Sequence, residues 1–444
     1  MSQPTLFGEE SQPSPAPKQQ ALQRAAAAGR VRLRQPQRKQ VELRPCSLEE
    51  LLPEEHRARD IWAVVERLDL RAFYEGIEAR EGGPGRDATD PKLLVALWLY
   101  ATAEGVGSAR EVARRCERDA AFRWLCGGVS LNHHTLSDFR VGHEAALDAL
   151  FTQLLATLLH QGLVGLQRIA QDGTRVRAWA GAASFRRQKS LQKCAQVAQA
   201  QVEACKRQAQ EPGPQANRRQ QAAAQRAAAD KQRRIEAALQ QLPKLTEVKK
   251  RNRDRAEPRV STTDADARVM KMADGGFRPA YNVQLATDVE SRVVVGVAVG
   301  NGGSDAGQLS PMLQQVQERC GKLPGSVLVD GGFTKLADIE EASDKGVRVL
   351  APPPEPKKEG VDRYAPKPGD SPQVAAWRQR MGSPEAREEY KLRAATAETL
   401  NADLKGRRGL TQVLVRGLGK VKCVALWAAL TYNVLRSLVL TANG

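Results

Sequence analysis

The second half of the chain alternates short β-branched runs with helical segments, and this alternation limits the folds that the chain can adopt. Residues 163–180 change from helical to strand periodicity around an Asp-Gly pair. The runs at 281–288 and 292–300 are joined by a short Val-Glu-Ser turn and predict a β-hairpin. SVLVDGG (326–332) predicts a short buried strand, and VRVLAPPP (347–354) predicts another.

Helical segments separate the later strands. The segment 304–321 carries capping residues at its start and ends at Gly321, and 334–346 predicts a second helix. A Pro- and charge-rich loop is expected over 355–384, followed by a long helix that begins near Pro384. The predicted order is βββαβαβα, which is the order of a ribonuclease H-like mixed α/β sheet.

The chain before this region is predicted to be all-helical over 46–160. The segment 108–128, a glycine pair and the segment 131–151 have the outline of a helix-turn-helix. The same outline occurs in helical packing units that bind no DNA. We expect a helical domain over 46–160, DNA-binding if the outline is a true helix-turn-helix, and a catalytic domain over 161–444.

Two further segments have a biased composition. Residues 184–250 are rich in Ala, Gln, Arg and Lys and are split by EPGP (211–214), which predicts an inserted helical hairpin. This hairpin is interpreted as a DNA-facing arm, a dimerisation coil or a solvated spacer. Residues 1–45 contain few large apolar side chains and predict a disordered basic arm.

The charge of the chain favours a polyanionic partner. It contains 68 Lys and Arg against 51 Asp and Glu, for a formal net charge of +17. Basic side chains bind phosphates and release counterions, so nucleic acid is the expected partner. The alternative is that the charge only keeps the protein soluble.

The cysteines and the apolar stretches indicate the cellular compartment in which the protein is expected to lie. Seven cysteines are scattered without a C-x-x-C pair, so we expect reduced thiols and no zinc site. The N-terminus lacks an apolar segment of signal-peptide length, and polar or charged residues interrupt the apolar stretches near 146–170 and 423–440. A cytoplasmic protein without a membrane partner is expected, and the last apolar helix is expected to pack on the sheet.

Three acidic residues occupy positions that the predicted topology would bring together. Asp172 follows the first strand, Asp330 follows the fourth, and Glu398 lies on the final long helix. Phosphodiester chemistry uses two divalent cations about 3.5–4 Å apart, and carboxylate oxygens hold such hard cations. Taken singly, an Asp-Gly pair is also a common turn and a helical Glu is usually solvated. Mg²⁺ is the expected ion, with Mn²⁺ as a substitute.

Several phrases together resemble the insertion-sequence transposases of the DDE class, in the branch with a helical N-terminal domain and a large insertion after the first aspartate. The resemblance covers about 50–440. The phrases that carry it are DPKLLVALWLYATAEGVGSAREV, RWLCGG with HHTLSDFR, QDGTRVRAWA, STTDADARVMK with FRPAYNVQLATD, LVDGGF and YKLRAATAETLNADLKGRRGL.

The resemblance implies roles for individual residues. It makes Asp172, Asp330 and Glu398 the three catalytic, metal-binding carboxylates. The Tyr, Arg, Glu and Lys signature of the family is matched by Tyr390, Arg393, Glu398 and Lys405, so Tyr390, Arg393 and Lys405 are expected to contact DNA. Glu398 and Lys405 are seven positions apart, which places them on one helix face.

The spacing before Glu398 departs from the pattern of related branches. Those branches leave three residues between the Arg and the Glu, whereas here four residues, AATA, separate Arg393 from Glu398. On an ideal α-helix this spacing turns Arg393 away from the face of Glu398. Either this branch accepts the additional residue, or Arg393 has another task.

The resemblance implies a transposase that binds the terminal inverted repeats of its element, cleaves DNA at the ends and joins them to target DNA. A homodimer on the paired ends is expected, because two ends are symmetric. Two alternatives stay open. One is a ribonuclease H-like nuclease that cuts double-stranded DNA without joining it, and the other is a non-catalytic DNA-binding relic.

Overall fold

The computed structural model describes residues 45–80, 86–210, 215–251, 253, 255–356 and 359–442, with the single positions 37, 39 and 41. The predicted basic arm over 1–45 lies almost entirely outside the described residues. The residues from Leu48 onward form one compact unit.

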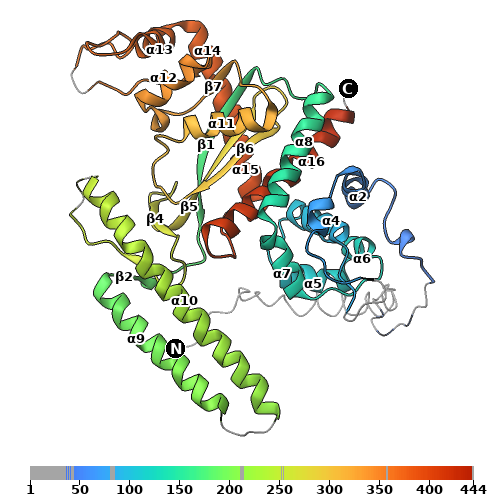
Figure 1. Cartoon of the computed structure of the whole chain (residues 1–444). Coiled ribbons are helices and arrows are strands. Elements are labelled where there is room, and N and C mark those ends of the chain that lie inside the picture. Colours follow the sequence, from blue (N-terminus) through green and yellow to red (C-terminus); the bar gives the residue numbers. More distant parts are fainter. Residues whose placement is uncertain are drawn as a thin grey trace, which may run out of the picture. The chain divides into compact units, whose positions relative to one another are not determined.

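A mixed sheet of six strands lies at the centre of the α/β part (Figure 1). The strand order is β4-β5-β1-β7-β8, and β6 also pairs with β5. β5 is antiparallel to β1, β4 and β6, whereas β1, β7 and β8 are mutually parallel. The predicted mixed α/β class is confirmed. The strands are β1 (Arg168–Arg177), β4 (Arg268–Lys271), β5 (Phe277–Asp288), β6 (Val294–Gly300), β7 (Ser326–Leu328) and β8 (Arg348–Leu350).

Helices connect and cover these strands. β6 leads into α11, β7 leads through the short helix η3 into α12, and four consecutive helical segments follow β8 before the last helix. α11 packs against β6, and α12 and α13 pack against β8. Their bounds are α11 (Leu309–Cys320), η3 (Gly331–Phe333), α12 (Leu336–Asp344), α13 (Pro372–Gly382), α14 (Pro384–Arg393), η4 (Ala394–Glu398) and α15 (Thr399–Gly406).

The N-terminal part is helical, as the sequence predicts. Twelve of the thirteen residues of α4 are buried, so this helix is apolar on every side and forms the centre of the group. The predicted helix 108–128 is broken at Asp119, which caps α6, and the predicted helix 131–151 is broken at His143. The helices are η1 (Glu49–Leu51), α2 (Arg57–Arg67), α3 (Arg71–Tyr74), α4 (Pro91–Ala103), α5 (Ala109–Arg118), α6 (Ala120–Cys126), α7 (His133–Gly142) and α8 (Glu144–His160).

The last helix, α16 (Leu418–Ala442), packs against both the N-terminal helices and the sheet. It contacts α4, α7 and α8 on one side and β6 on the other. The buried Asn433 side chain accepts from the backbone N–H of Val294 and donates to its carbonyl, both at 2.8 Å. Its length and hydropathy are those of a membrane span, but two-thirds of its most apolar window is buried in the protein, as in the core helix of a soluble protein.

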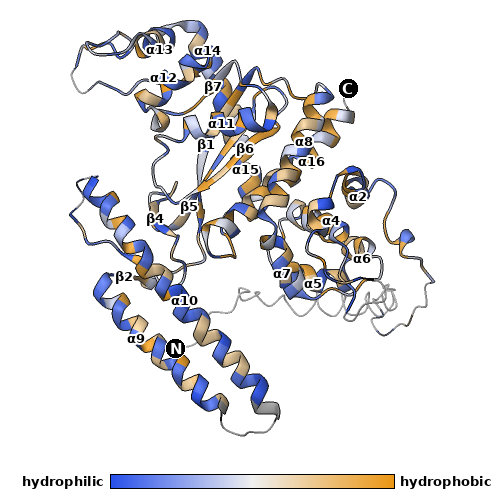
Figure 2. Ribbon diagram, in the orientation of Figure 1, coloured by the Kyte–Doolittle hydropathy of each residue, from blue (hydrophilic) through white to orange (hydrophobic). Residues whose placement is uncertain are grey.

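Two long helices, α9 (Gln188–Gln210) and α10 (Gln215–Arg251), lie in the range where the sequence predicts a helical hairpin. They pack along each other, and Figure 2 shows that both are mainly hydrophilic. Leu191, Ala238 and Leu242 pack with Val260 in a small separate core. The strands β2 (Phe185–Arg186) and β3 (Val260–Ser261) pair antiparallel at the base of the hairpin.

The expected loop over 355–384 is wrong in part, because α13 lies within it. Ser371 caps this helix by accepting from the N–H of Val374, and Pro372 occupies the first helical position. Val374 and Trp377 are fully buried, so their burial stabilises the helix despite the polar surroundings.

Candidate active site

Asp172 and Asp330 lie at the same level of two neighbouring parallel strands. Ala170 of β1 is paired with Leu328 of β7. Asp172 is two positions after Ala170, and Asp330 is two positions after Leu328. Residues two positions apart in an extended chain project from the same face. The strand register therefore brings both carboxylates to one face of the sheet, at the point where β7 ends.

One guanidinium nitrogen contacts both aspartates. Nη2 of Arg393 lies 3.1 Å from Oδ1 of Asp172 and 3.7 Å from Oδ2 of Asp330. The side chains of Arg393 and Asp172 are 13% and 17% exposed, so water screens this contact only partly. Burial raises the pKa of Asp172, Arg393 opposes this rise, and the nearby Asp330 adds to it. A cation between the two carboxylates is therefore favoured.

The second oxygen of Asp172 is held by Asn401 of α15. Nδ2 of Asn401 donates to Oδ2 of Asp172 at 2.8 Å, while the N–H of Gly173 donates to Oδ1 at 3.0 Å. The Oδ1 atom of Asn401 is buried and has no partner among the described residues. The orientation of the Asp172 carboxylate is thus fixed from both sides.

A π-helical turn resolves the unusual spacing before Glu398. The segment η4 (Ala394–Glu398) joins α14 to α15 and is π-helical. Arg393 and Glu398 are five positions apart, and in an α-helix this spacing would rotate one side chain by roughly 140° relative to the other. In a π-helix the hydrogen bonds join residues five apart, so five positions make about one turn and the two side chains lie on the same face. Arg393 accordingly contacts Asp172, and Glu398 lines the same cleft as Asp172. The helix accepts the additional residue, and both side chains face the site.

Asp172 and Glu398 line a cleft of about 860 Å³. Its wall combines acidic residues with a larger number of basic ones. The acidic residues are Asp172, Asp274, Asp305 and Glu398, and the basic residues are Arg175, Arg177, Lys271, Arg278 and Lys405. Carboxylates that can hold cations, surrounded by side chains that can bind phosphates, suit a polyanionic substrate.

Tyr390 and Lys405, which are also predicted to contact DNA, lie near this cleft. Lys405 lines it; burial lowers the pKa of Lys405, and the charge of Asp172 opposes that effect. Burial raises the pKa of Tyr390, and the charges of Asp330, Asp172 and Glu398 raise it further. The structure thus places Tyr390 and Lys405 in the electrostatic field of the predicted carboxylates.

The three predicted carboxylates do not form a closed ligand cluster. Within the described residues, no three His, Cys, Asp or Glu side chains lie close enough to hold a metal ion together. Asp172 and Asp330 do flank a single cationic nitrogen, and Glu398 is exposed on the same cleft. This donor set suits Mg²⁺, which binds one or two protein carboxylates and completes its shell with water and phosphate oxygens.

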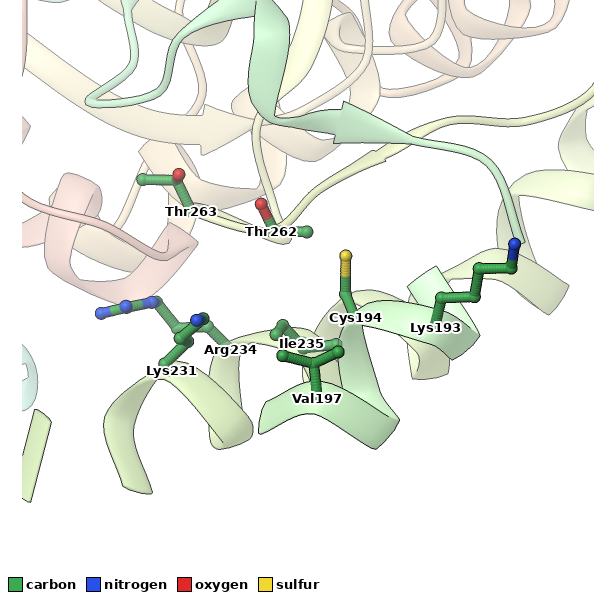
Figure 3. Close-up of a pocket in the computed structure, with 8 residues that line it drawn as sticks. All are labelled: Lys193, Cys194, Val197, Lys231, Arg234, Ile235, Thr262 and Thr263. Atoms are coloured by element: carbon green, nitrogen blue, oxygen red, sulfur yellow. The ribbon is translucent and has the colours of Figure 1, made fainter. Parts of the chain in front are cut away.

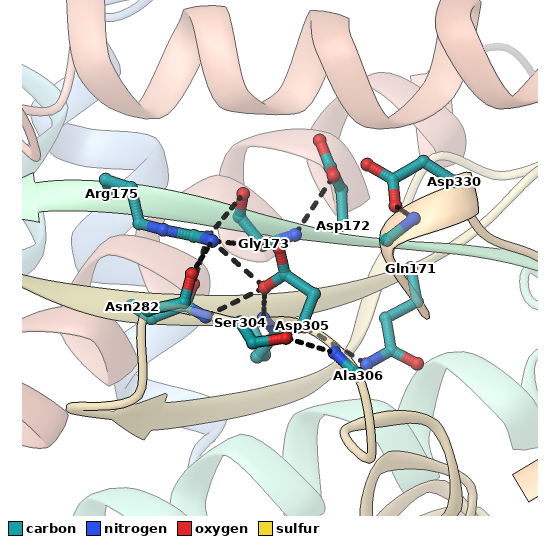
Figure 4. Close-up of polar contacts among 12 residues, drawn as sticks. Gln171, Asp172, Gly173, Arg175, Asn282, Ser304, Asp305, Ala306 and Asp330 are labelled. Carbon is teal, nitrogen blue, oxygen red and sulfur yellow. Dashed lines mark hydrogen bonds and ion pairs between the residues drawn. The ribbon is translucent and has the colours of Figure 1, made fainter. Parts of the chain in front are cut away.

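A second polar network lies under β1, on the face opposite the Asp172 carboxylate (Figure 4). Oδ1 of Asp305 accepts from Asn282 at 2.8 Å and from Gln284 at 2.6 Å. Arg175 donates to both carboxylate oxygens of Asp305, at 3.2 and 3.0 Å. Asp305 lies in the segment whose first residues were expected to cap a helix, but it does not cap α11, because its side chain binds the strands instead.

Gly173 allows this network to approach the strand. A Cβ atom at position 173 would lie 2.2 Å from Oδ1 of Asp305 and 2.4 Å from Nε2 of Gln284. Both distances are too short for any side chain. The glycine after Asp172 therefore lets Asp305 pack directly against the backbone that carries Asp172, and any larger residue there would force the Asp305 and Gln284 side chains to shift.

Sequence reasoning missed Asn401, Asp305 and Arg175. Asn401 is three positions after Glu398, so helical periodicity alone places both on one face and could have indicated it. Arg175 is two positions after Gly173 on the same strand, but its partner Asp305 is 130 residues away, and no local pattern joins them.

Two family models match the chain. The model described as "Transposase domain (DUF772)" matches residues 46–142, and the model described as "Transposase DDE domain" matches residues 257–434. The first match covers most of the N-terminal helices, and the second covers Asp330, Arg393 and Glu398. Neither a curated protein nor a solved structure matches the chain.

Proposed function

The chain belongs to the insertion-sequence transposases of the DDE class, and from this premise we propose that it cuts and joins DNA at the ends of its element with Asp172, Asp330 and Glu398. The placement of Asp172 and Asp330 on one face, around the nitrogen of Arg393, supports this proposal most directly. The reaction is hydrolysis of one phosphodiester at each end, followed by attack of the freed 3′-hydroxyl on target DNA.

A ribonuclease H-like fold is part of the proposal. The order β6-β5-β1-β7-β8, with only β5 antiparallel to its neighbours, agrees with three antiparallel strands followed by two parallel βα units. In this reading the catalytic domain spans 161–444, the helical hairpin at about 184–250 is an insertion, and the helices of 46–160 bind the terminal inverted repeats.

Two Mg²⁺ ions, replaceable by Mn²⁺, are the proposed cofactors. When bound, such ions activate the attacking oxygen and stabilise the leaving oxygen. Asp172 and Asp330 would hold them, with Glu398 supplying the third carboxylate. Asn401 and Gly173 orient the Asp172 carboxylate for that task, and so reduce the entropy lost on binding.

The remaining residues of the signature bind the substrate. Lys405, on the wall of the cleft, is positioned to neutralise a DNA phosphate, and Tyr390 and Arg393 are proposed to contact the backbone beside the scissile bond. The protein is proposed to act as a homodimer on paired ends, in the bacterial cytoplasm and without a membrane partner.

The decisive experiment is cleavage of a supercoiled plasmid that carries the ends of the element, with Mg²⁺ or EDTA. We expect Mg²⁺-dependent cutting at the ends by the wild type and none by Asp172→Asn, Asp330→Asn or Glu398→Gln. Asp274→Asn is the matched control, because Asp274 is a carboxylate of the same cleft that pairs with Arg278. Binding to the ends, measured separately, should survive all four substitutions.

The rival functions give different results in the same experiment. A nuclease without joining activity would cut the ends but yield no strand-transfer product with a target plasmid. A DNA-binding relic would bind the ends and never cut. Cutting that persists in all three carboxylate variants would overturn the assignment of the site.

A further inference from the structure

The helical hairpin carries a large share of the positive charge of the chain. Residues 188–251 contain fourteen Lys and Arg and five Asp and Glu, a net +9 out of the total of +17. Part of this charge is neutralised locally, because Arg233 pairs with Asp230 and Lys250 pairs with Glu247. Lys193, Lys231 and Arg234 form no ion pair with another residue that the structure describes.

Three of the basic side chains surround a cavity at the base of the hairpin. The cavity has a volume of about 400 Å³ and lies between α9, α10 and the loop after β3. Lys193 of α9 and Lys231 and Arg234 of α10 line it, and Thr262 and Thr263 face the two helices across it (Figure 3). The cavity contains no acidic lining residue, so its electrostatic potential favours an anion.

Arg234 and Arg416 are the least satisfied cations of this region. The Nε atom of each is buried without a hydrogen-bond partner, and neither guanidinium forms an ion pair in the part of the chain that the structure describes. Burial lowers the pKa of Arg416, the positive charge of Arg234 lowers it further, and the charges of Asp264 and Asp230 oppose this decrease. Asp230 and Asp264 offset part of the repulsion between the two guanidinium groups but form no ion pair with either of them. An anion bound between the two groups would offset the repulsion further.

The surface of the hairpin does not suit self-association through an apolar seam. Among the described residues of α9 and α10, only Val197 and Val248 are large hydrophobic side chains that are exposed. A dimerisation coil needs an apolar residue every three to four positions along one face. The charge of the hairpin, in contrast, suits the backbone of DNA.

We propose that Lys193, Lys231, Arg234 and Arg416, which we call the basal cluster, bind a backbone phosphate of double-stranded DNA at the base of the hairpin. This inference rests on the proposed function, since the DNA is that of the transposition reaction. The basal cluster is separate from the residues that line the catalytic cleft. The hairpin is thereby a second DNA-contacting surface and not a spacer.

The test compares two double variants of equal charge. Arg234→Gln with Arg416→Gln removes two cations from the basal cluster. Arg207→Gln with Arg226→Gln removes two exposed cations from the same helices, away from the cavity. Binding to a duplex of the element end is measured in EDTA over a range of salt concentrations, and thermal melting verifies that each variant is folded.

The basal-cluster variant is expected to bind the duplex about 10- to 100-fold more weakly near 0.15 M salt. The slope of log K against log salt concentration is expected to be smaller in magnitude by about one to two. The control variant is expected to lose less than about threefold. Duplexes with one methylphosphonate linkage then locate the phosphate: a neutral linkage there weakens wild-type binding and leaves the basal-cluster variant unaffected.

Equal losses in both variants would show diffuse attraction and overturn the proposal, as would unchanged binding. Unchanged DNA binding with a shift in sedimentation coefficient would assign the cluster to self-association instead. Because binding is measured in EDTA, these outcomes are independent of cleavage. Failure of the wild type to cut with Mg²⁺ would count against the proposed function alone.

Discussion

Arg393 and Asp172 form a largely buried ion pair in which Nη2 lies 3.1 Å from Oδ1, and the same nitrogen lies 3.7 Å from Asp330. The guanidinium therefore offsets the repulsion between two neighbouring carboxylates. A divalent cation bound by the aspartates would offset the same repulsion. If the aspartates bind metal ions as proposed, Arg393 and those ions would both neutralise the same pair of carboxylates.

This linkage predicts how Mg²⁺ affects stability in an Arg393→Gln variant. Without added metal, the variant should lose roughly 1–3 kcal/mol of unfolding free energy, because two partly buried carboxylates lose their counter-charge. Mg²⁺ should then raise its melting temperature more than that of the wild type. Thermal melting at several Mg²⁺ concentrations checks this, with Arg387→Gln on the same helix as the control. Equal Mg²⁺ effects in all three proteins would contradict the linkage.

The π-helical turn predicts the effect of single-residue deletions. Deleting the exposed Ala395 lets η4 become α-helical and leaves Arg393 and Glu398 four positions apart, which is again about one turn. Folding and end cleavage should survive, with activity within about tenfold of the wild type. Deleting the exposed Thr399 instead rotates Glu398 by roughly 100° relative to Asn401 and Lys405, and cleavage should be lost.

Plasmid cleavage and circular dichroism of the two deletion variants decide this prediction. Loss of cleavage in both deletions, with folding intact, would mean that the π-helical geometry is itself required.

The close approach of Asp305 predicts that Gly173→Ala is harmful. The added methyl would overlap Oδ1 of Asp305, so we expect a loss of about 1–3 kcal/mol of stability together with weakened cleavage. Gly181→Ala is the matched control, because a Cβ atom there meets no atom within 4 Å. Urea denaturation measures both. A Gly173→Ala protein as stable as the control would show that β1 moves easily at this point.

The buried Asp264 predicts a pH-dependent stability. Asp264 is 2% exposed, accepts from the Tyr281 hydroxyl at 2.8 Å, and burial raises the pKa of Asp264 above its ordinary value of 3.8. A raised pKa means that the folded state binds the proton more tightly than the unfolded state. Asp264 therefore lowers stability progressively as the pH rises from about its ordinary pKa through its folded pKa.

Asp264→Asn should remove this dependence and keep an acceptor for Tyr281. The melting temperature of the variant, relative to the wild type, is expected to increase from pH 4 to pH 8. Parallel pH profiles for the two proteins would contradict the assignment of the dependence to Asp264.

The sequence was informative where a local pattern determines the structure. The β-branched runs predicted β5 and β6 to within four residues at either end, and the strand-to-turn signal placed Asp330 just after β7. The same signal was wrong at Asp172, because β1 continues through the Asp-Gly pair to Arg177 and pairs there with β5. Periodicity could not reveal the π-helical turn, because only the hydrogen bonds of the folded helix distinguish it from an α-helix. The Arg175–Asp305 ion pair could not be predicted from the sequence either, because it joins a strand to a loop through tertiary contact alone.

α16 has a consequence for the inheritance of the gene. This 25-residue helix packs against both the N-terminal helices and β6. A premature stop codon shortly before α16 would leave Asp172, Asp330 and Glu398 encoded. It would remove the helix that packs against both the N-terminal helices and the sheet. On the proposed function, copies of the element that carry such a late stop should therefore be immobile, even where the codons of the three proposed catalytic residues are intact.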